Sequence, residues 1–150
     1  MNWYITYFYN TRYMKANQLP VSTAMWPPKF FAKSSKTSDI HFNDNHVMFG
    51  ITSKELVPQE QCECPCEKKD YQHCCFLKKY KEQLDEVDFF DFIDKWTCFS
   101  NQFSKIAGTE ITDIILLVYE KPGNHCSERT VLKKWFQEHG IELKEMEVIK

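Results

Sequence analysis

The sequence contains few of the residues that interrupt regular structure, with four glycines and six prolines in 150 residues. Its longest uninterrupted apolar run, Ile114 to Val118, is far shorter than a helix that crosses a bilayer. The polar and aromatic segment from Met1 to Asn10 lacks the charged and apolar regions of a secretory signal peptide. We therefore expect a cytoplasmic protein with no membrane contacts.

A strong charge of one sign is also missing. The chain has 19 Lys and Arg against 21 Asp and Glu, which gives a formal net charge of −2. A basic field over the whole surface is therefore excluded, so nucleic acid is a possible partner that the net charge does not favour. Hydrophobic residues make up 43% of the chain, which is enough for the core of one domain over residues 1–150. Nothing in the composition indicates the oligomeric state.

Hydrophobic periodicity indicates alternating strands and helices. The last forty residues have the pattern strand, helix, strand, and the strand at 111–120 is apolar on both faces, as in a central parallel strand. The expected elements are strands at 2–10, 111–120 and 141–149, an extended segment that begins at residue 19 and is stopped by Pro27 and Pro28, a small hairpin around 43–45, and helices at 76–84, 89–108 and 127–139. This order predicts an α/β fold: a small Rossmann-like three-layer domain with a mainly parallel sheet.

The helix at 89–108 is the most strongly patterned element. Asp88 is placed to cap it and Gly108 to end it. A stripe with helical spacing is expected to face the core, with Cys98 beside it. Its members are Phe89, Ile93, Trp96, Phe99, Phe103 and Ile106.

The segment that follows the central strand, "YEKPGNHCSERTVLKKWF", predicts a ligand site. In open α/β sheets, ligands bind beyond the carboxyl ends of strands, where helix N-termini present free N–H groups. Pro122 and Gly123 predict a sharp turn, and Arg129 offers a planar donor fork to an anion. Cys126 would be a nucleophile with a lowered pKa at the helix N-terminus, and Glu120 a base or a ligand of a ribose hydroxyl.

A purely structural interpretation of the same residues is equally compatible with the local sequence. Glu120 and Arg129 would then form an ion pair that ties the turn to the helix, and Cys126 would pack as a small hydrophobic residue.

Two segments resemble a known family. "LPVSTAMWPPKFF" and "IILLVYEKPGNHCSERTVLKKWFQEHGIEL" are similar to the YeaO-like family, domain of unknown function 488. The resemblance implies an α/β fold with a pocket to which no reaction is assigned. It places residues of two motifs at one crevice: Ser22, Trp26 and Pro27 from the first, and Glu120, Pro122, Cys126 and Arg129 from the second.

The sequence departs from the pattern of that family at two places. Many members have Cys-His-Arg where this chain has Cys-Ser-Glu-Arg, and many have an arginine where Met25 stands. A histidine that would act as an acid or base and one cation that would bind an anion are therefore missing. These departures weaken the expectation of catalysis more than the expectation of binding.

Five of the seven cysteines are clustered in "CECPCEKKDYQHCC", within an insertion expected at residues 58–76. Thiols in the cytoplasm stay reduced, so a metal site is favoured over disulfides. The candidate donors are Cys62, Cys64, Cys66, His73, Cys74 and Cys75. The expected ligand set is Cys62, Cys66, Cys74 and Cys75 around a structural zinc ion, with an iron–sulfur cluster as the less favoured alternative and a reduced, exposed loop as the simplest one.

Three functions follow from these patterns. The first is binding of a small anionic nucleotide-like ligand at the crevice between the Ser22–Pro28 and Glu120–Arg129 segments. The second is an enzyme that acts on a nucleotide or nucleobase, in DNA modification or repair, through Cys126 or Glu120. The third is a phage-encoded protein that sequesters a nucleotide messenger or blocks a host factor. The aromatic residues at 3–13 are also able to stack a nucleobase, although such residues more often belong to the core.

Overall fold

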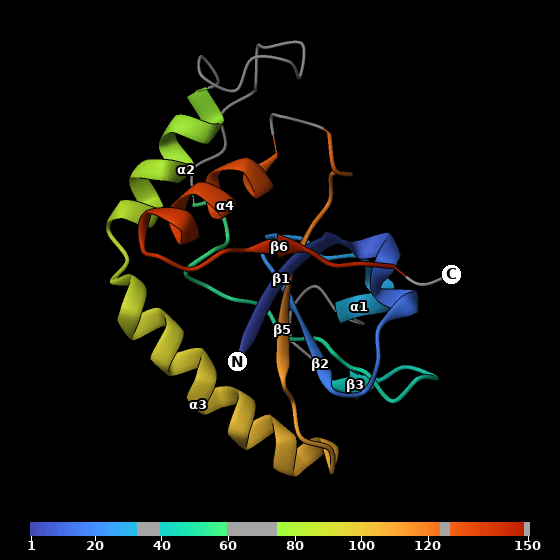
Figure 1. Ribbon diagram of the computed structural model, residues 1–150. Helices are drawn as coiled ribbons and strands as arrows, with labels where there is room; N and C mark the ends of the chain where they lie inside the picture. The colour runs from blue at the N-terminus through green and yellow to red at the C-terminus, as the bar shows by residue number, and fades with distance from the viewer. Residues whose placement is uncertain (33–39, 60–74, 124–126, 149–150) are drawn as a thin grey trace.

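The computed structural model describes residues 1–32, 40–59, 75–123 and 127–148. Its strands are β1 (Asn2–Tyr7), β2 (Gln18–Ser22), β3 (His41–Phe42), β4 (Met48–Phe49), β5 (Asp113–Val118) and β6 (Lys144–Glu145). Its helices are the 3₁₀-helix η1 (Phe8–Tyr13) and the α-helices α1 (Lys29–Ala32), α2 (Cys75–Asp85), α3 (Phe89–Ala107) and α4 (Glu128–Glu138). Figure 1 shows their arrangement.

A four-stranded parallel sheet in the order β2-β5-β1-β6 forms the centre of the fold. Helices α2, α3 and α4 cover one face, and η1 and α1 cover the other (Figure 1). The β3–β4 hairpin lies next to β2 and contributes Met48 to the core on the first face and Phe49 to the core on the second. The predicted α/β class, parallel sheet and three layers are therefore confirmed. The predicted hairpin is also present, with His41 opposite Phe49 in an antiparallel pair.

The position of β5 in the sheet explains why its sequence is apolar from Ile114 to Val118. Ile114, Leu116 and Val118 pack into the core under α2, α3 and α4, whereas Ile115 and Leu117 pack into the core on the opposite face. Successive side chains of a strand point to opposite faces, so a strand covered on both sides has no polar positions to offer. Because β5 lies between β2 and β1, the chain leaves the sheet at Tyr119 between the ends of these two strands.

Helix α3 has the predicted ends. The side chain of Asp88 accepts a hydrogen bond from the Asp91 N–H at 3.1 Å, and Gly108 closes the helix with φ of 69°. The predicted stripe is wrong at Ile106, which is 59% exposed, because this residue lies in the last turn and at the margin of the apolar face. Phe92, which the prediction omitted, is buried between Trp3 and Trp135 instead.

Two further predictions need correction. The strand expected at 141–149 pairs with β1 only over Lys144–Glu145, at the edge of the sheet. Cys98, expected beside the apolar stripe, is exposed on α3.

The expected insertion at 58–76 lies mostly at residues 60–74, outside the described residues. Its last two residues, Cys75 and Phe76, form the start of α2, as the sequence predicted for that helix. Within the part of the chain that the structure describes, we find no helix with the length and apolarity needed to cross a membrane.

Candidate functional site

Three neighbouring strands deliver their carboxyl ends to one edge of the sheet. Tyr7 at the end of β1 is in register with Val118 at the end of β5, and Ser22 at the end of β2 is in register with Leu117. Thr23 fastens the exit from β2, because both its N–H and its hydroxyl donate to the Leu117 carbonyl, at 3.1 and 2.8 Å. The segments that follow these strands therefore start side by side, at the place where parallel sheets bind ligands.

Tyr119 joins these segments. Its ring lies 4.9 Å from the ring of Phe8, the first residue after β1, and its hydroxyl donates a hydrogen bond to the Trp26 carbonyl. Partial burial raises the pKa of Tyr119, so this hydroxyl remains protonated and able to donate at neutral pH. The structure thus brings the Ser22–Pro28 segment and the start of the Glu120–Arg129 segment together.

Side chains at this edge present aromatic surface to solvent. We call Tyr9, Trp26 and Tyr119 the rim aromatics; each follows the end of one of the three strands, and Trp26 is 63% exposed. The guanidinium carbon of Arg12 lies 3.7 Å from the centre of the Tyr9 ring, within the range of a cation–π contact. Exposed aromatic faces next to a cation are a surface on which planar ligands stack.

The remaining predicted ligand residues occupy different environments. Ser22 is buried, and its hydroxyl accepts a hydrogen bond from the Ala24 N–H at 3.0 Å, so it shapes the turn after β2. Pro27 is half-buried. Pro122 is exposed in a turn with Gly123, whose φ of 99° explains the glycine.

Ser127, which the sequence interpretation treated only as the start of a helix, organises the mouth of α4. Its hydroxyl accepts a hydrogen bond from the Arg129 N–H at 3.2 Å and donates one to the Glu120 carboxylate at 3.0 Å. Its carbonyl accepts from the Thr130 N–H at 3.2 Å. Serine is a preferred N-cap residue, so the serine just before the helix was the sequence signal for this role.

Arg129 is 4% exposed, and its guanidinium group contacts other residues of the chain. Its Nη1 donates to the Glu120 backbone carbonyl at 2.5 Å, and its Nε forms an ion pair at 2.5 Å with Glu145 on β6. The structural interpretation of the sequence paired Arg129 with the Glu120 carboxylate; the contact is with the Glu120 carbonyl, and Glu145 is the carboxylate partner. Nη2 of Arg129 is buried and has no hydrogen-bond partner among the described residues.

Glu145 was missed because no local pattern connects it to Arg129. The two residues meet only because β6 pairs with β1, which places Glu145 opposite Ile5. Lys133, one turn after Arg129 on α4, lies 3.0 Å from the same carboxylate oxygen. Glu145 therefore balances one buried and one half-exposed cation.

Glu128 occupies the first position of α4, and its pKa is raised from 4.5 to about 7. Burial is the main cause, and the neighbouring Glu120 carboxylate adds to it, whereas a hydrogen bond from its own N–H and the charge of Arg129 act in the opposite direction. Glu128 therefore gains or loses its proton near neutral pH.

The N–H groups in the first turn of α4 that would bind an anion are largely occupied by acceptors of the chain itself. The N–H groups of Glu128, Arg129 and Thr130 contact, in order, the Glu128 carboxylate, the Ser127 hydroxyl and the Ser127 carbonyl. An external anion at this helix end must compete with Glu128.

The predicted thiol chemistry falls outside the described residues. Cys126 lies in residues 124–126, and three of the four expected metal ligands, Cys62, Cys66 and Cys74, lie in residues 60–74. Cys75 is the first residue of α2. In the ranges that the structure describes, no three His, Cys, Asp or Glu side chains are grouped to hold a metal ion.

Comparison with protein-family models, with curated proteins and with solved structures finds no match. The resemblance to the YeaO-like family therefore stays a prediction, and what the site does is argued from its geometry alone.

Proposed function

We propose that the protein binds a small nucleotide-like ligand at the carboxyl edge of the sheet, between the Ser22–Pro28 segment and the mouth of α4. The observation that carries the proposal is the exposed indole of Trp26, in a segment fixed by the bond from the Tyr119 hydroxyl to the Trp26 carbonyl. A large exposed aromatic side chain in a tethered segment is a stacking surface with little entropy to lose on binding.

The rim aromatics supply the base-binding part of this site. Stacking a base on an aromatic side chain contributes about 1–3 kcal/mol. This is less than the roughly 4 kcal/mol that millimolar affinity requires, so polar contacts must add to it. Those contacts lie at the other end of the site, where Glu120 offers a carboxylate to ribose hydroxyls and the buried Arg129 holds the Glu120 backbone in place through the Glu120 carbonyl.

The charge at the mouth of α4 determines how an anionic ligand binds. Arg129 and Lys133 are already opposed by Glu145, and Glu128 lies on the helix N-terminus, so an ionised phosphate meets repulsion at neutral pH. Protonation of Glu128 removes this repulsion. Nucleotide binding is therefore expected to strengthen as the pH falls through about 7, whereas nucleoside binding is expected to change less.

Calorimetric titration with nucleosides and their monophosphates tests the proposal. Trp26→Ala should weaken binding by about tenfold or more, the loss of one stacking contact. Phe90→Ala is the matched control, because Phe90 is also an exposed aromatic residue but lies on α3. Binding that survives Trp26→Ala, or that Phe90→Ala weakens equally, rules the proposed site out.

A second candidate, an enzyme that acts on the same ligand, is favoured by the Glu120–Glu128 pair. A carboxyl group with a pKa of about 7 is suited to proton transfer at neutral pH. The nucleophile of this candidate is the predicted Cys126. Cys126→Ser should then abolish turnover and retain binding. If the protein only binds the ligand, the wild type itself forms no product.

A further inference from the structure

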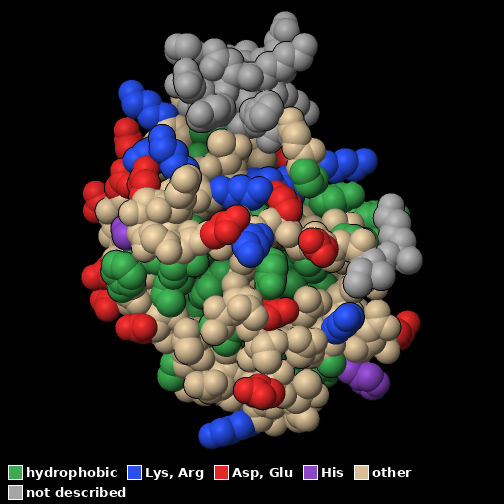
Figure 2. Space-filling view, viewed as in Figure 1, with side chains coloured by type: hydrophobic (Ala, Val, Ile, Leu, Met, Phe, Trp, Pro, Cys, Tyr) green, Lys and Arg blue, Asp and Glu red, His purple; other side chains and the backbone are tan. Residues whose placement is uncertain are grey.

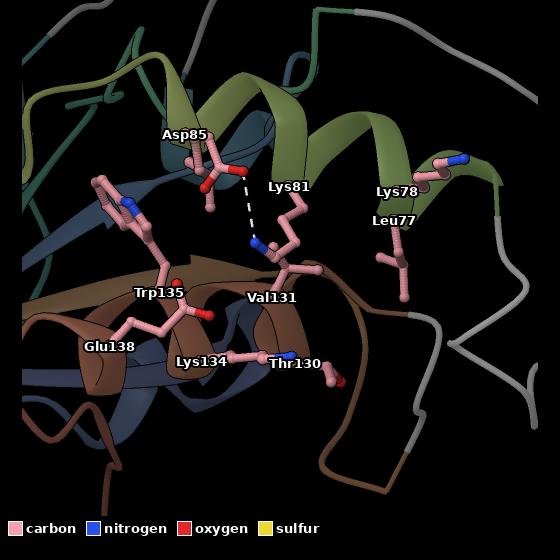
Figure 3. A pocket seen from close by; sticks show the side chains of 10 residues that line it. Leu77, Lys78, Lys81, Asp85, Thr130, Val131, Lys134, Trp135 and Glu138 are labelled. Atoms are coloured by element: carbon pink, nitrogen blue, oxygen red, sulfur yellow. Dashed lines mark hydrogen bonds and ion pairs between the residues drawn. The ribbon is translucent and has the colours of Figure 1, made fainter.

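Helices α2 and α4 pack side by side over the sheet (Figure 1), and between them lies a cavity of about 270 Å³ that is open to solvent. Figure 3 shows the side chains that line it from both helices. They are Leu77, Lys78, Lys81, Leu84 and Asp85 from α2, and Thr130, Val131, Lys134, Trp135 and Glu138 from α4. Thr130 also lies in the first turn of α4, whereas the other nine residues belong neither to the rim aromatics nor to the mouth of α4. The cavity therefore adjoins the site proposed above at one residue and is otherwise separate from it.

The cavity combines an apolar interior with a charged margin. Val131 is partly exposed at its floor, and Leu77, Leu84 and Trp135 lie buried beneath it, which gives the apolar lining that is usual in ligand pockets. Three lysines and two carboxylates surround it, which leaves an excess of one positive charge. Figure 2 shows basic and acidic side chains close together on the surface over α2 and α4.

Two of the lysines are available to a ligand. Lys134 has no ion-pair partner among the described residues, and its ammonium group points along the cavity toward Thr130 (Figure 3). Lys81 extends from the opposite helix and pairs with Asp85 at 3.4 Å. Both members of that pair are about half-exposed, and exposed ion pairs are worth little, so a ligand can exchange with Asp85 at small cost.

We infer that this cavity binds a small amphipathic anion of the aromatic carboxylate or sulfonate class. The ring of the ligand lies against Val131 and the edge of Trp135, and its anionic group lies between Lys81 and Lys134. The volume suits a ligand of about two fused rings. Burial of the ring supplies most of the affinity, and the two ammonium groups select an anion over a neutral molecule.

Calorimetric titration with naphthalene-2-sulfonate tests the inference, with naphthalene-2-sulfonamide as a neutral analogue of the same shape. The sulfonate should bind about tenfold more tightly than the sulfonamide. Lys134→Gln should weaken sulfonate binding by about fivefold, and Asp85→Asn should strengthen it by releasing Lys81. Lys105→Gln, which removes the same charge from α3, should change it less than about twofold.

A steric variant separates this cavity from any other apolar surface. Val131→Phe places a larger side chain in the cavity and should abolish sulfonate binding, while Trp26→Ala should have no effect on it. The inference is overturned if the wild type binds the sulfonate and the sulfonamide equally, or if it does not bind the sulfonate at all. It is also overturned if Val131→Phe binds the sulfonate as tightly as the wild type does.

Discussion

The Nε atom of Arg129 on α4 lies 2.5 Å from the carboxylate of Glu145 on the edge strand β6. This ion pair connects the helix that follows β5 to the last strand of the sheet. It also orients the guanidinium group, so that Nη1 contacts the Glu120 carbonyl at the carboxyl end of β5. The same arginine therefore contributes to the stability of the fold and to the geometry of the proposed site.

Arg129→Met is expected to lower the free energy of unfolding by roughly 3 kcal/mol, because it leaves Glu145 and the Glu120 carbonyl without the buried partner. Lys133→Met is the matched control. It removes a half-exposed cation from the same Glu145 oxygen and should cost less than about 1 kcal/mol. Urea denaturation of the wild type and the two variants measures both losses of unfolding free energy. Equal losses would show that burial of Arg129 is not the reason for its contribution to stability.

The stability of the protein should depend on pH through Glu128. The folded-state pKa of about 7 is above the unfolded value of 4.5, so the folded protein binds this proton more tightly. The contribution of Glu128 to stability is therefore complete below about pH 4.5 and is lost as the pH rises to about 7 and above.

Glu128→Gln removes this titration and isolates its contribution. The stability of the wild type relative to Glu128→Gln should fall as the pH rises from 4.5 to about 7 and then level off. Denaturation at a series of pH values measures this difference. A constant difference over that interval would contradict the environment described for Glu128.

The bond between Tyr119 and the Trp26 carbonyl is expected to order the rim. Tyr119→Phe should reduce stability by about 1 kcal/mol, the typical net value of a hydrogen bond, and should weaken ligand binding by allowing the Trp26 segment to move. Tyr9→Phe serves as a control, because the Tyr9 hydroxyl makes no hydrogen bond within the described residues. Similar affinity losses for the two variants would exclude an ordering role for Tyr119.

The cysteine cluster leads to a prediction about metal content. We expect one zinc ion per chain, bound by Cys62, Cys66, Cys74 and Cys75, because thiolates at short spacing are the donors that zinc prefers. Native mass spectrometry of the purified protein measures the bound mass, and Cys62→Ser with Cys66→Ser should remove it. Cys98→Ser, which changes an exposed cysteine on α3, should not. A wild-type mass equal to that of the chain alone would contradict a bound metal.

Local patterns were sufficient to predict the fold. The uninterrupted apolar residues of β5 indicated a strand covered on both faces, and Asp88 and Gly108 marked the ends of α3, because each of these signals lies within a few neighbouring residues. The length of β6 could not be predicted in this way, since an alternating sequence does not specify how many of its residues find a partner at the edge of a sheet.

The site was only partly predictable. The order of the motifs located the loop after β5, and the structure places Tyr119 of that loop against the Trp26 segment. The partner of Arg129 and the environment of Glu128 depend on the sheet order and on burial, neither of which the local sequence encodes. The cavity between α2 and α4 was missed for the same reason, because its lining comes from two helices far apart in the sequence.

The proposed ligand site is tested most directly by following backbone amides and the Trp26 indole N–H by NMR while nucleoside monophosphates are added. Trp26 is suited to this measurement because the other three tryptophans, Trp3, Trp96 and Trp135, are buried. The proposal predicts that the largest shifts occur at Tyr9, Trp26, Tyr119 and the first turn of α4. Spectra that stay unchanged at millimolar ligand, or shifts that are centred on residues away from this edge of the sheet, would contradict it.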